Sequence, residues 1–218
     1  MKKQSLLLLF IAILAFTACK KNDNNDDNNN SSTYQSKGYI PLKVGSYWIY
    51  QSYRDRGNGT DTALAETDST YISGTSVINS NTYYIFEQYG IAKSKAYLRD
   101  SVGYLVDTFG HIIMSEVNFS DTLYTRTEYM PNTGAPMVHI SRLMYDEHQQ
   151  IDVPAGIFDN CLEARDRVKA YIGNPAQPNP YFQRNYYAKN IGLVEYTYRF
   201  VGMGEIYKKK LIRYYIPN

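Results

Sequence analysis

Four carboxylates could take part in acid–base chemistry, and they lie in separate, apolar-rich segments of the chain: Glu87, Asp107, Glu116 and Glu195. A glycosidase needs two such groups beside the bond it breaks, one to donate a proton and one to act as base or nucleophile. A pair would therefore have to come from distant strands. The spacing does not show that any two converge, and we expect most of them to be solvated.

Other patterns of catalysis and metal binding are missing from the sequence. It contains no G-x-S-x-G elbow, no phosphate-cradling glycine loop, no H-E-x-x-H and no C-x-x-C. His111, His139 and His148 are far apart and lack the spacing of metal ligands. We therefore expect no catalytic residue, no metal site and no cofactor, and a protein that is not an enzyme.

Cys19 has the clearest covalent chemistry. Lys2 and Lys3 precede an apolar run over 6–16, which is typical of a signal peptide and too short to cross a bilayer. Phe-Thr-Ala directly before Cys19 resembles the lipobox of bacterial lipoprotein precursors. That resemblance implies that residues 1–18 are removed and that Cys19 carries diacylglycerol through a thioether. An ordinary secretory signal or an uncleaved anchor is the alternative.

Residues 19–38 predict a disordered tether rich in Asn and Asp. From residue 20 the chain reads KKNDNNDDNNNSS, with no apolar side chain to bury. A flexible chain of this length has a reach of about 25 Å. Asp23, Asp26 and Asp27 resemble the acidic signal that sends some Gram-negative lipoproteins to the surface of the outer membrane. A plain hydrophilic spacer explains them equally well.

Net charge and cysteine content limit the classes of partner that the protein is expected to bind. Removing Lys2 and Lys3 with the signal leaves 21 basic and 21 acidic side chains, so the mature chain has no net charge and binding to nucleic acid is disfavoured. The predicted partner is instead the membrane, through acyl chains such as palmitate on Cys19. Cys161 is the second of the two cysteines and is expected to be a small buried hydrophobe.

Four Asp-Ser or Asp-Thr pairs resemble the acceptor of an envelope O-glycosylation system found in some Gram-negative bacteria. Their candidate acceptors are Thr62, Ser69, Ser101 and Thr122. Asp followed by Ser or Thr is also common in turns, which is the alternative explanation.

Residues 39–218 predict one antiparallel β domain with at most one or two short helices, near 63–68 or 145–150. The segment is dense in Tyr, Ile, Val, Thr and Phe, and turn residues divide it into short runs. The expected strands are Tyr47 to Arg54, Thr62 to Ser73, Thr82 to Tyr89, Lys95 to Asp100, Tyr104 to Phe109, Ile112 to Phe119, Leu123 to Tyr129, Val138 to Glu147, Leu162 to Tyr171, Tyr181 to Ala188, Leu193 to Val201 and Ile206 to Ile216.

The alternation of side chains predicts that the sheet is curved. Between 193 and 200, Val194, Tyr196, Tyr198 and Phe200 share one face, while the opposite face is largely polar. A sheet with one apolar and one wet face must bury the apolar one. A single curved sheet, as a half-barrel or barrel-like fold, does so and protects its edges.

Three stretches together resemble a family of tethered Gram-negative envelope lipoproteins that is grouped with the LolA-like half-barrel fold and has no characterised function. They are PLKVGSYWIY at 41–50, VPAGIFDNC at 153–161 and YYAKNIGLV at 186–194. The residues themselves have structural explanations, because Trp48 can serve as a large buried anchor and Pro154-Ala155-Gly156 is typical of a turn. The resemblance implies a fold and a location, and no catalytic residue.

Two functions remain open besides catalysis. The first is a non-catalytic, membrane-anchored envelope lipoprotein that binds a hydrophobic ligand or lipid on the concave face of its sheet, which requires a cavity of at least about 300 Å³. The second is a surface lipoprotein with a structural, adhesive or glycan-binding role, because exposed aromatic rings can stack on sugars.

Overall fold

The computed structural model describes residues 34–218 except 57–59, 91, 173–178 and 202–203. The predicted signal peptide, Cys19 and residues 19–33 of the predicted tether lie outside the described residues. No helix in the described ranges is long and apolar enough to cross a membrane.

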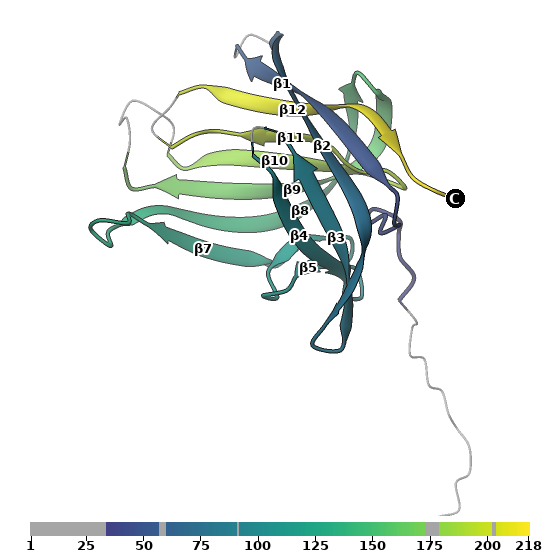
Figure 1. Ribbon diagram of the computed structural model, residues 1–218. Helices are drawn as coiled ribbons and strands as arrows, with labels where there is room; N and C mark the ends of the chain where they lie inside the picture. Colours follow the sequence, from purple (N-terminus) through teal and green to yellow (C-terminus); the bar gives the residue numbers. More distant parts are fainter. Residues whose placement is uncertain (1–33, 57–59, 91, 173–178, 202–203) are drawn as a thin grey trace, which may run out of the picture. The chain divides into compact units, whose positions relative to one another are not determined.

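The described chain forms one antiparallel sheet of twelve strands, as the sequence predicts (Figure 1). The strands are β1 (Tyr47–Asp55), β2 (Asp61–Ile78), β3 (Asn81–Tyr89), β4 (Ser94–Asp100), β5 (Tyr104–Asp107), β6 (Ile112–Ser115), β7 (Tyr124–Tyr129), β8 (Pro136–Val153), β9 (Gly156–Ala170), β10 (Tyr181–Ala188), β11 (Gly192–Tyr198) and β12 (Ile206–Tyr215). No helix is found among the described residues, and both places considered for one lie in strands, 63–68 in β2 and 145–150 in β8.

The strand order explains how the sheet is built from local hairpins. It runs β6-β5-β4-β3-β2-β1-β12-β11-β10-β9-β8-β7. The chain starts at the centre with β1, meanders out to β6 at one edge, crosses to β7 at the other edge, and meanders back to β12 beside β1. Short turns between sequential strands favour this antiparallel arrangement.

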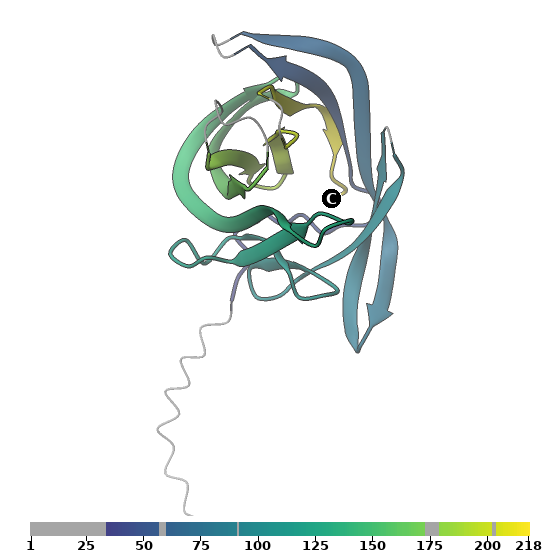
Figure 2. The same ribbon diagram turned by 90° about the vertical axis from the view of Figure 1, so that its left-hand side faces the viewer.

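Bulges bend the longest strands and curl the sheet. The register of β2 shifts between Ile72 and Gly74 against β3, and that of β8 shifts twice between Tyr145 and Ile151 against β9. An extra residue in one strand bends it and increases its twist. Figure 2 shows the result, with β2 bending around one side and β8 and β9 around the other.

Contacts between the two edges nearly close the curl. The Arg142 guanidinium in β8 donates a hydrogen bond of 2.9 Å to the carbonyl oxygen of Ile113 in β6. The ring of His111, just before β6, meets that of Tyr124 in β7 edge-on, with centroids 5.0 Å apart. The predicted curved sheet with a protected interior is therefore confirmed.

The three sequence stretches at 41–50, 153–161 and 186–194 meet in one core. Trp48 is 4% exposed and packs in the same buried cluster as Val153, Cys161 and Val194. The Trp48 indole donates a 2.7 Å hydrogen bond to the carbonyl oxygen of Ile191. The structural roles expected for Trp48 and for the buried Cys161 are confirmed, and burial raises the pKa of the Cys161 thiol to about 11.

Glu116, in the crossing between β6 and β7, holds the segment that precedes β1. Its fully buried carboxylate accepts hydrogen bonds from the Tyr34 hydroxyl and from the backbone amides of Lys37, at 2.6 Å, and Tyr39, at 3.0 Å. The residues that follow, Tyr39 and Ile40, are buried in the second core cluster. Charge-assisted bonds to a buried carboxylate thus fix this segment against the inside of the sheet.

Candidate ligand-binding cavity

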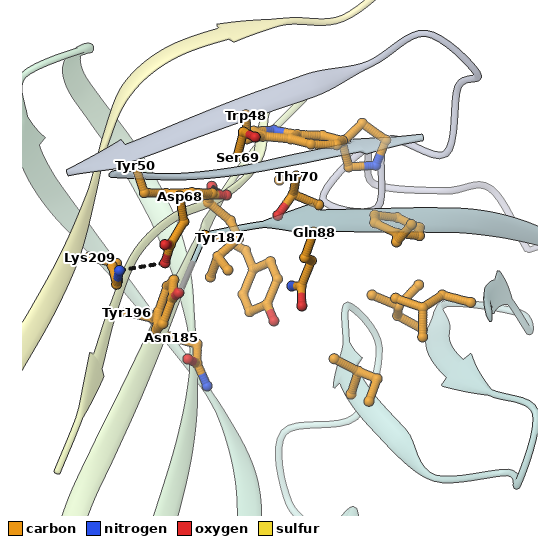
Figure 3. Close-up of a pocket in the computed structure, with 18 of the residues that line it drawn as sticks. Trp48, Tyr50, Asp68, Ser69, Thr70, Gln88, Asn185, Tyr187, Tyr196 and Lys209 are labelled. Carbon is orange, nitrogen blue, oxygen red and sulfur yellow. Dashed lines mark hydrogen bonds and ion pairs between the residues drawn. The ribbon is translucent and has the colours of Figure 1, made fainter. Parts of the chain in front are cut away.

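The curled sheet encloses a cavity of about 700 Å³ that is open on one side and mostly apolar (Figure 3). Its walls come from the segment before β1 and from every strand except β7 and β9. The lining residues are Tyr39, Ile40, Pro41, Leu42, Trp48, Tyr50, Asp68, Ser69, Thr70, Phe86, Gln88, Tyr89, Gly90, Ala92, Leu98, Leu105, Ile113, Arg142, Asn185, Tyr187, Gly192, Leu193, Tyr196, Tyr198, Phe200 and Lys209.

Aromatic rings form much of the wall. Trp48 stacks on Phe86 with centroids 6.2 Å apart, and Tyr50 meets Tyr196 edge-on at 5.9 Å. The Tyr50 hydroxyl is used internally, since it donates to the carbonyl oxygen of Leu193 at 2.9 Å. The aromatic face predicted for residues 193–200 does line the cavity, through Tyr196, Tyr198 and Phe200.

One buried ion pair interrupts the apolar wall. The Lys209 ammonium in β12 contacts the Asp68 carboxylate in β2 across the central strand β1. The Lys209 side chain is 6% exposed and that of Asp68 is 25% exposed. Gly90 permits this arrangement, because a Cβ atom at that position would overlap the Asp68 carboxylate.

Arg142 is the third charged lining residue, and its charge is neutralised by a neighbour. Two of its nitrogens donate to the two carboxylate oxygens of Asp166, each at 2.6 Å. A third nitrogen donates to Ile113, as described above. Burial lowers the pKa of Arg142, but this bidentate pairing with Asp166 outweighs it and raises the pKa overall.

Tyr187 supplies a hydroxyl inside the cavity that has no hydrogen-bond partner among the described residues. The residue is 7% exposed, and Figure 3 shows its side chain pointing into the space between the walls. Burial raises the pKa of Tyr187 to about 12, so the hydroxyl stays neutral at physiological pH. It can therefore donate a hydrogen bond to a guest molecule.

The structure does not bring the four candidate carboxylates together. None of them lines the cavity, and no contact joins any two of them. Each has partners of its own. Glu87 contacts Lys95 at 3.0 Å and Tyr71 at 2.8 Å, and Asp107 contacts His111 at 2.9 Å. Glu116 is bound by the Tyr34 hydroxyl and two backbone amides, and Glu195 lies 4.0 Å from Lys210.

Environment shifts the pKa values of three of these carboxyls: those of Glu87 and Asp107 are lowered and that of Glu195 is raised. Hydrogen bonds from Tyr71 and Lys95 lower the pKa of Glu87 to about 2. Burial raises the pKa of Glu195, and the nearby Lys210 only partly opposes it. Perturbed carboxyls can mark an active site when they share a cleft, but these three lie on different strands of the sheet.

The three histidines also lie apart. His111 contacts Asp107, His139 lies 2.9 Å from the Thr127 hydroxyl, and His148 lies 3.4 Å from Asp146. Within the described ranges, no group of three or more His, Cys, Asp or Glu side chains could hold a metal ion.

The candidate glycosylation sites have different surroundings. Thr62 in β2 and Thr122 before β7 are exposed, and Ser101 is partly exposed in the turn after β4. Ser69 lines the cavity, so a sugar on it would compete with any guest for space. Modification at these residues stays a prediction, as does lipidation of Cys19 outside the described residues.

Sequence reasoning missed the Asp68–Lys209 pair, although a signal for it was present. Residues 208–210 are three consecutive lysines, and side chains of a strand alternate between its faces. Lys208 and Lys210 both contact Asp61, whereas Lys209 lies on the opposite face. A run of three lysines in a strand with one buried face therefore predicts one inward lysine and a carboxylate beside it.

Comparison with known proteins identifies the fold. No protein-family model matches the sequence, and no curated protein is significantly similar to it. A protein of Parabacteroides distasonis, described as a "putative lipoprotein", superposes with a TM-score of 0.54 at 13% identity, covering 83% of this chain and 100% of its own. A protein of Bacteroides fragilis, described as a "putative exported protein with YmcC-like fold", has a TM-score of 0.52 at 14% identity and the same coverage. The chain shares the fold of these two proteins.

Proposed function

We propose that the chain is a non-catalytic lipoprotein of the bacterial cell envelope, anchored in the outer membrane through acyl chains on Cys19, that binds a hydrophobic ligand inside its curved sheet. The observation that carries the binding role is the cavity of about 700 Å³. Ligand sites in proteins typically measure about 300–1,000 Å³ and combine apolar walls with a few polar groups. The cavity has both properties.

The envelope location rests on two independent supports. The first is the sequence before residue 20, with its positive start, apolar run and Phe-Thr-Ala-Cys ending. The second is that the two proteins of the same fold are described as a "putative lipoprotein" and a "putative exported protein". A half-barrel of the LolA-like kind, tethered by a polar tail, fits a role in holding apolar molecules near a membrane.

The acid–base groups of the described cavity lining are already paired with each other, which favours binding over catalysis. Asp68 is the one described carboxylate in the cavity lining, and it is committed to Lys209. A general acid or base must be free to exchange its proton with a substrate. The lining instead offers rings, methyl groups and neutral hydrogen-bonding groups, which hold a guest without transforming it.

A cavity-filling substitution tests the binding role. Thr70 in β2 lines the cavity beside its register partner Trp48 in β1, so Thr70→Phe adds a ring to the space where the guest would lie. Overfilling such a space costs about 1–3 kcal/mol, which corresponds to binding that is weaker by about fivefold to about 150-fold. Thr75→Phe, on the exposed part of the same strand, is the matched control.

The measurement is mass spectrometry of molecules that co-purify with a soluble form, residues 20–218, exported to the envelope behind a cleavable signal. We expect an apolar compound with the unaltered chain and with Thr75→Phe, and a loss of most of it with Thr70→Phe. Equal recovery from both variants, each folded by circular dichroism, would remove the cavity as the binding site.

The alternative role in glycan binding has one specific support, a cluster of rings formed by the lining residues Tyr198 and Phe200 with Tyr207. Tyr198 stacks on Tyr207 with centroids 5.3 Å apart, and Phe200 meets both rings edge-on and is 53% exposed. Exposed rings of this kind can stack on sugars. A glycan array that returns binding abolished by Tyr207→Ala, with no apolar compound co-purifying, would favour this role instead.

A further inference from the structure

The cavity has a polar end and an apolar end. The polar end consists of Asp68, Asn185, Tyr196 and Lys209, which Figure 3 shows gathered at one side. They come from β2, β10, β11 and β12. The other end is mostly apolar and is lined from the segment before β1 and from β3 to β6, by Ile40, Leu42, Phe86, Leu98, Leu105 and Ile113. The Arg142 guanidinium, already paired with Asp166, lies at this end too, because it donates to the Ile113 carbonyl oxygen. A guest that fits both ends must itself be amphiphilic.

All charges along the cavity wall are already balanced. Of the described lining residues, three are charged, and Lys209 is paired with Asp68 while Arg142 is paired with Asp166. A carboxylate or ammonium group on a guest would enter this space without a free counter-charge. Burying an unpaired charge is costly, so the wall disfavours both anionic and cationic headgroups.

Neutral hydrogen-bonding groups remain available in the same place. At the polar end, the Asn185 side chain and the Tyr196 hydroxyl have no hydrogen-bond partner among the described residues. The Tyr187 hydroxyl is also unpartnered among them, and Tyr187 packs in the core cluster that contains Leu98 and Leu105. Tyrosine hydroxyls are neutral at physiological pH, and burial raises the pKa values of Tyr187 and Tyr196 still further. These groups can donate to and accept from hydroxyl groups of a guest.

We infer that the ligand is an amphiphile with an uncharged, hydroxylated headgroup, as in a monoacylglycerol, whose head lies beside Asn185, Tyr196 and the Asp68–Lys209 pair and whose acyl chain lies among Leu98, Leu105 and Ile113. This inference rests on the proposed binding function and adds the class and orientation of the ligand.

A comparison of three amphiphiles with the same chain tests the headgroup. Lauroylglycerol is neutral, laurate is anionic and dodecylamine is cationic at neutral pH. Each is titrated into residues 20–218, below its aggregation concentration, while the emission of Trp48 is followed. We expect lauroylglycerol to bind at least about tenfold more tightly than either charged compound, because only its head is accommodated without an unpaired charge.

Two substitutions that unbalance the ion pair should change this preference in opposite directions. Asp68→Asn leaves Lys209 without its counter-charge. It should therefore strengthen the binding of laurate by about tenfold relative to that of dodecylamine. Lys209→Met leaves Asp68 unpaired and should favour dodecylamine instead. Each variant is the control for the other, because a general loosening of the fold would shift both charged compounds alike.

The outcomes separate the inference from the function on which it rests. If none of the three compounds binds, the hydrophobic-ligand function fails and the inference fails with it. If all three bind equally to the unaltered chain, the function stands and the inference about the headgroup is overturned. If the ranking holds but neither folded variant shifts it, the headgroup does not lie at the Asp68–Lys209 pair and the proposed orientation is wrong.

Discussion

Replacing Arg142 with leucine should lower the free energy of unfolding by about 3–5 kcal/mol, because it leaves a buried carboxylate without its partner. The Asp166 side chain is 8% exposed and receives two hydrogen bonds of 2.6 Å from Arg142. Leucine can fill part of the space but provides no donor. The Asp166 charge would then be both desolvated and unpaired.

The same substitution should also loosen the closure of the sheet. Arg142 donates to the carbonyl oxygen of Ile113, which joins β8 to the edge strand β6. Without that bond, the backbone amides of β6 should exchange with solvent faster than they do in the unaltered chain. The amides of the central strand β1 should change less. Hydrogen exchange measured by mass spectrometry resolves this difference strand by strand.

Urea denaturation measures the stability change, and Arg126→Leu serves as the control. Arg126 in β7 forms an ion pair with Glu128, but both side chains are well exposed, at 52% and 37%. Surface pairs contribute about 0–1 kcal/mol, so this variant should lose little stability. Similar losses from the two variants would contradict the role assigned to Arg142 in holding the curl closed.

Cys19→Ser should abolish incorporation of labelled palmitate into the protein. If Cys19 is the lipidated residue, serine removes the sulfur to which the diacylglycerol is attached. Each buried methylene contributes about 0.8 kcal/mol to membrane binding, so two or three chains anchor far more firmly than a single marginal one. The soluble form, residues 20–218 behind another cleavable signal, should fractionate away from the envelope.

Cys161→Ser is the matched control for the lipidation test. Cys161 is the second of the two cysteines, and its side chain is fully buried in the first core cluster. It cannot accept a lipid without unfolding, so this variant should keep the full palmitate label. Label that persists after Cys19→Ser, or that is missing from the unaltered chain, would contradict the anchoring.

The strands were predictable because the signals that define them are local. Alternating side chains and turn residues give the centre of each of the twelve strands, and Tyr181–Ala188 was predicted to its ends. The end of β6 was predicted wrongly: the expected strand continues to Phe119, whereas β6 ends at Ser115. Ser115 ends it by accepting hydrogen bonds from the backbone amides of Val117 and Asn118, which makes a turn.

The length of β8 was also missed, for a different reason. The predicted strand stops at Glu147, where polar residues break the alternation, whereas β8 continues to Val153. The continuation passes through a bulge in which His148 adopts a positive φ of 44°. Alternation cannot be followed through a bulge from sequence alone, because the extra residue exchanges the two faces.

The aromatic character of the cavity wall was predictable from the sequence. The polar end of the cavity was not. The aromatic face of β11 follows from its alternation. The Asp68–Lys209 pair depends on β12 returning to lie beside β1, which joins residues far apart in the sequence. Such long-range neighbours arise from the pairing of the last strand with the first and not from any local pattern.

Quenching of Trp48 emission tests the ligand cavity most directly. Trp48 is the one tryptophan in the sequence, and it lines the cavity against Phe86. An amphiphile with bromine atoms on its acyl chain quenches a tryptophan only when the two are in contact. We predict saturable quenching in residues 20–218 and in Thr75→Phe, and little quenching in Thr70→Phe. Emission that stays unchanged in the unaltered chain, or that is quenched equally in both folded variants, would contradict binding inside the curled sheet.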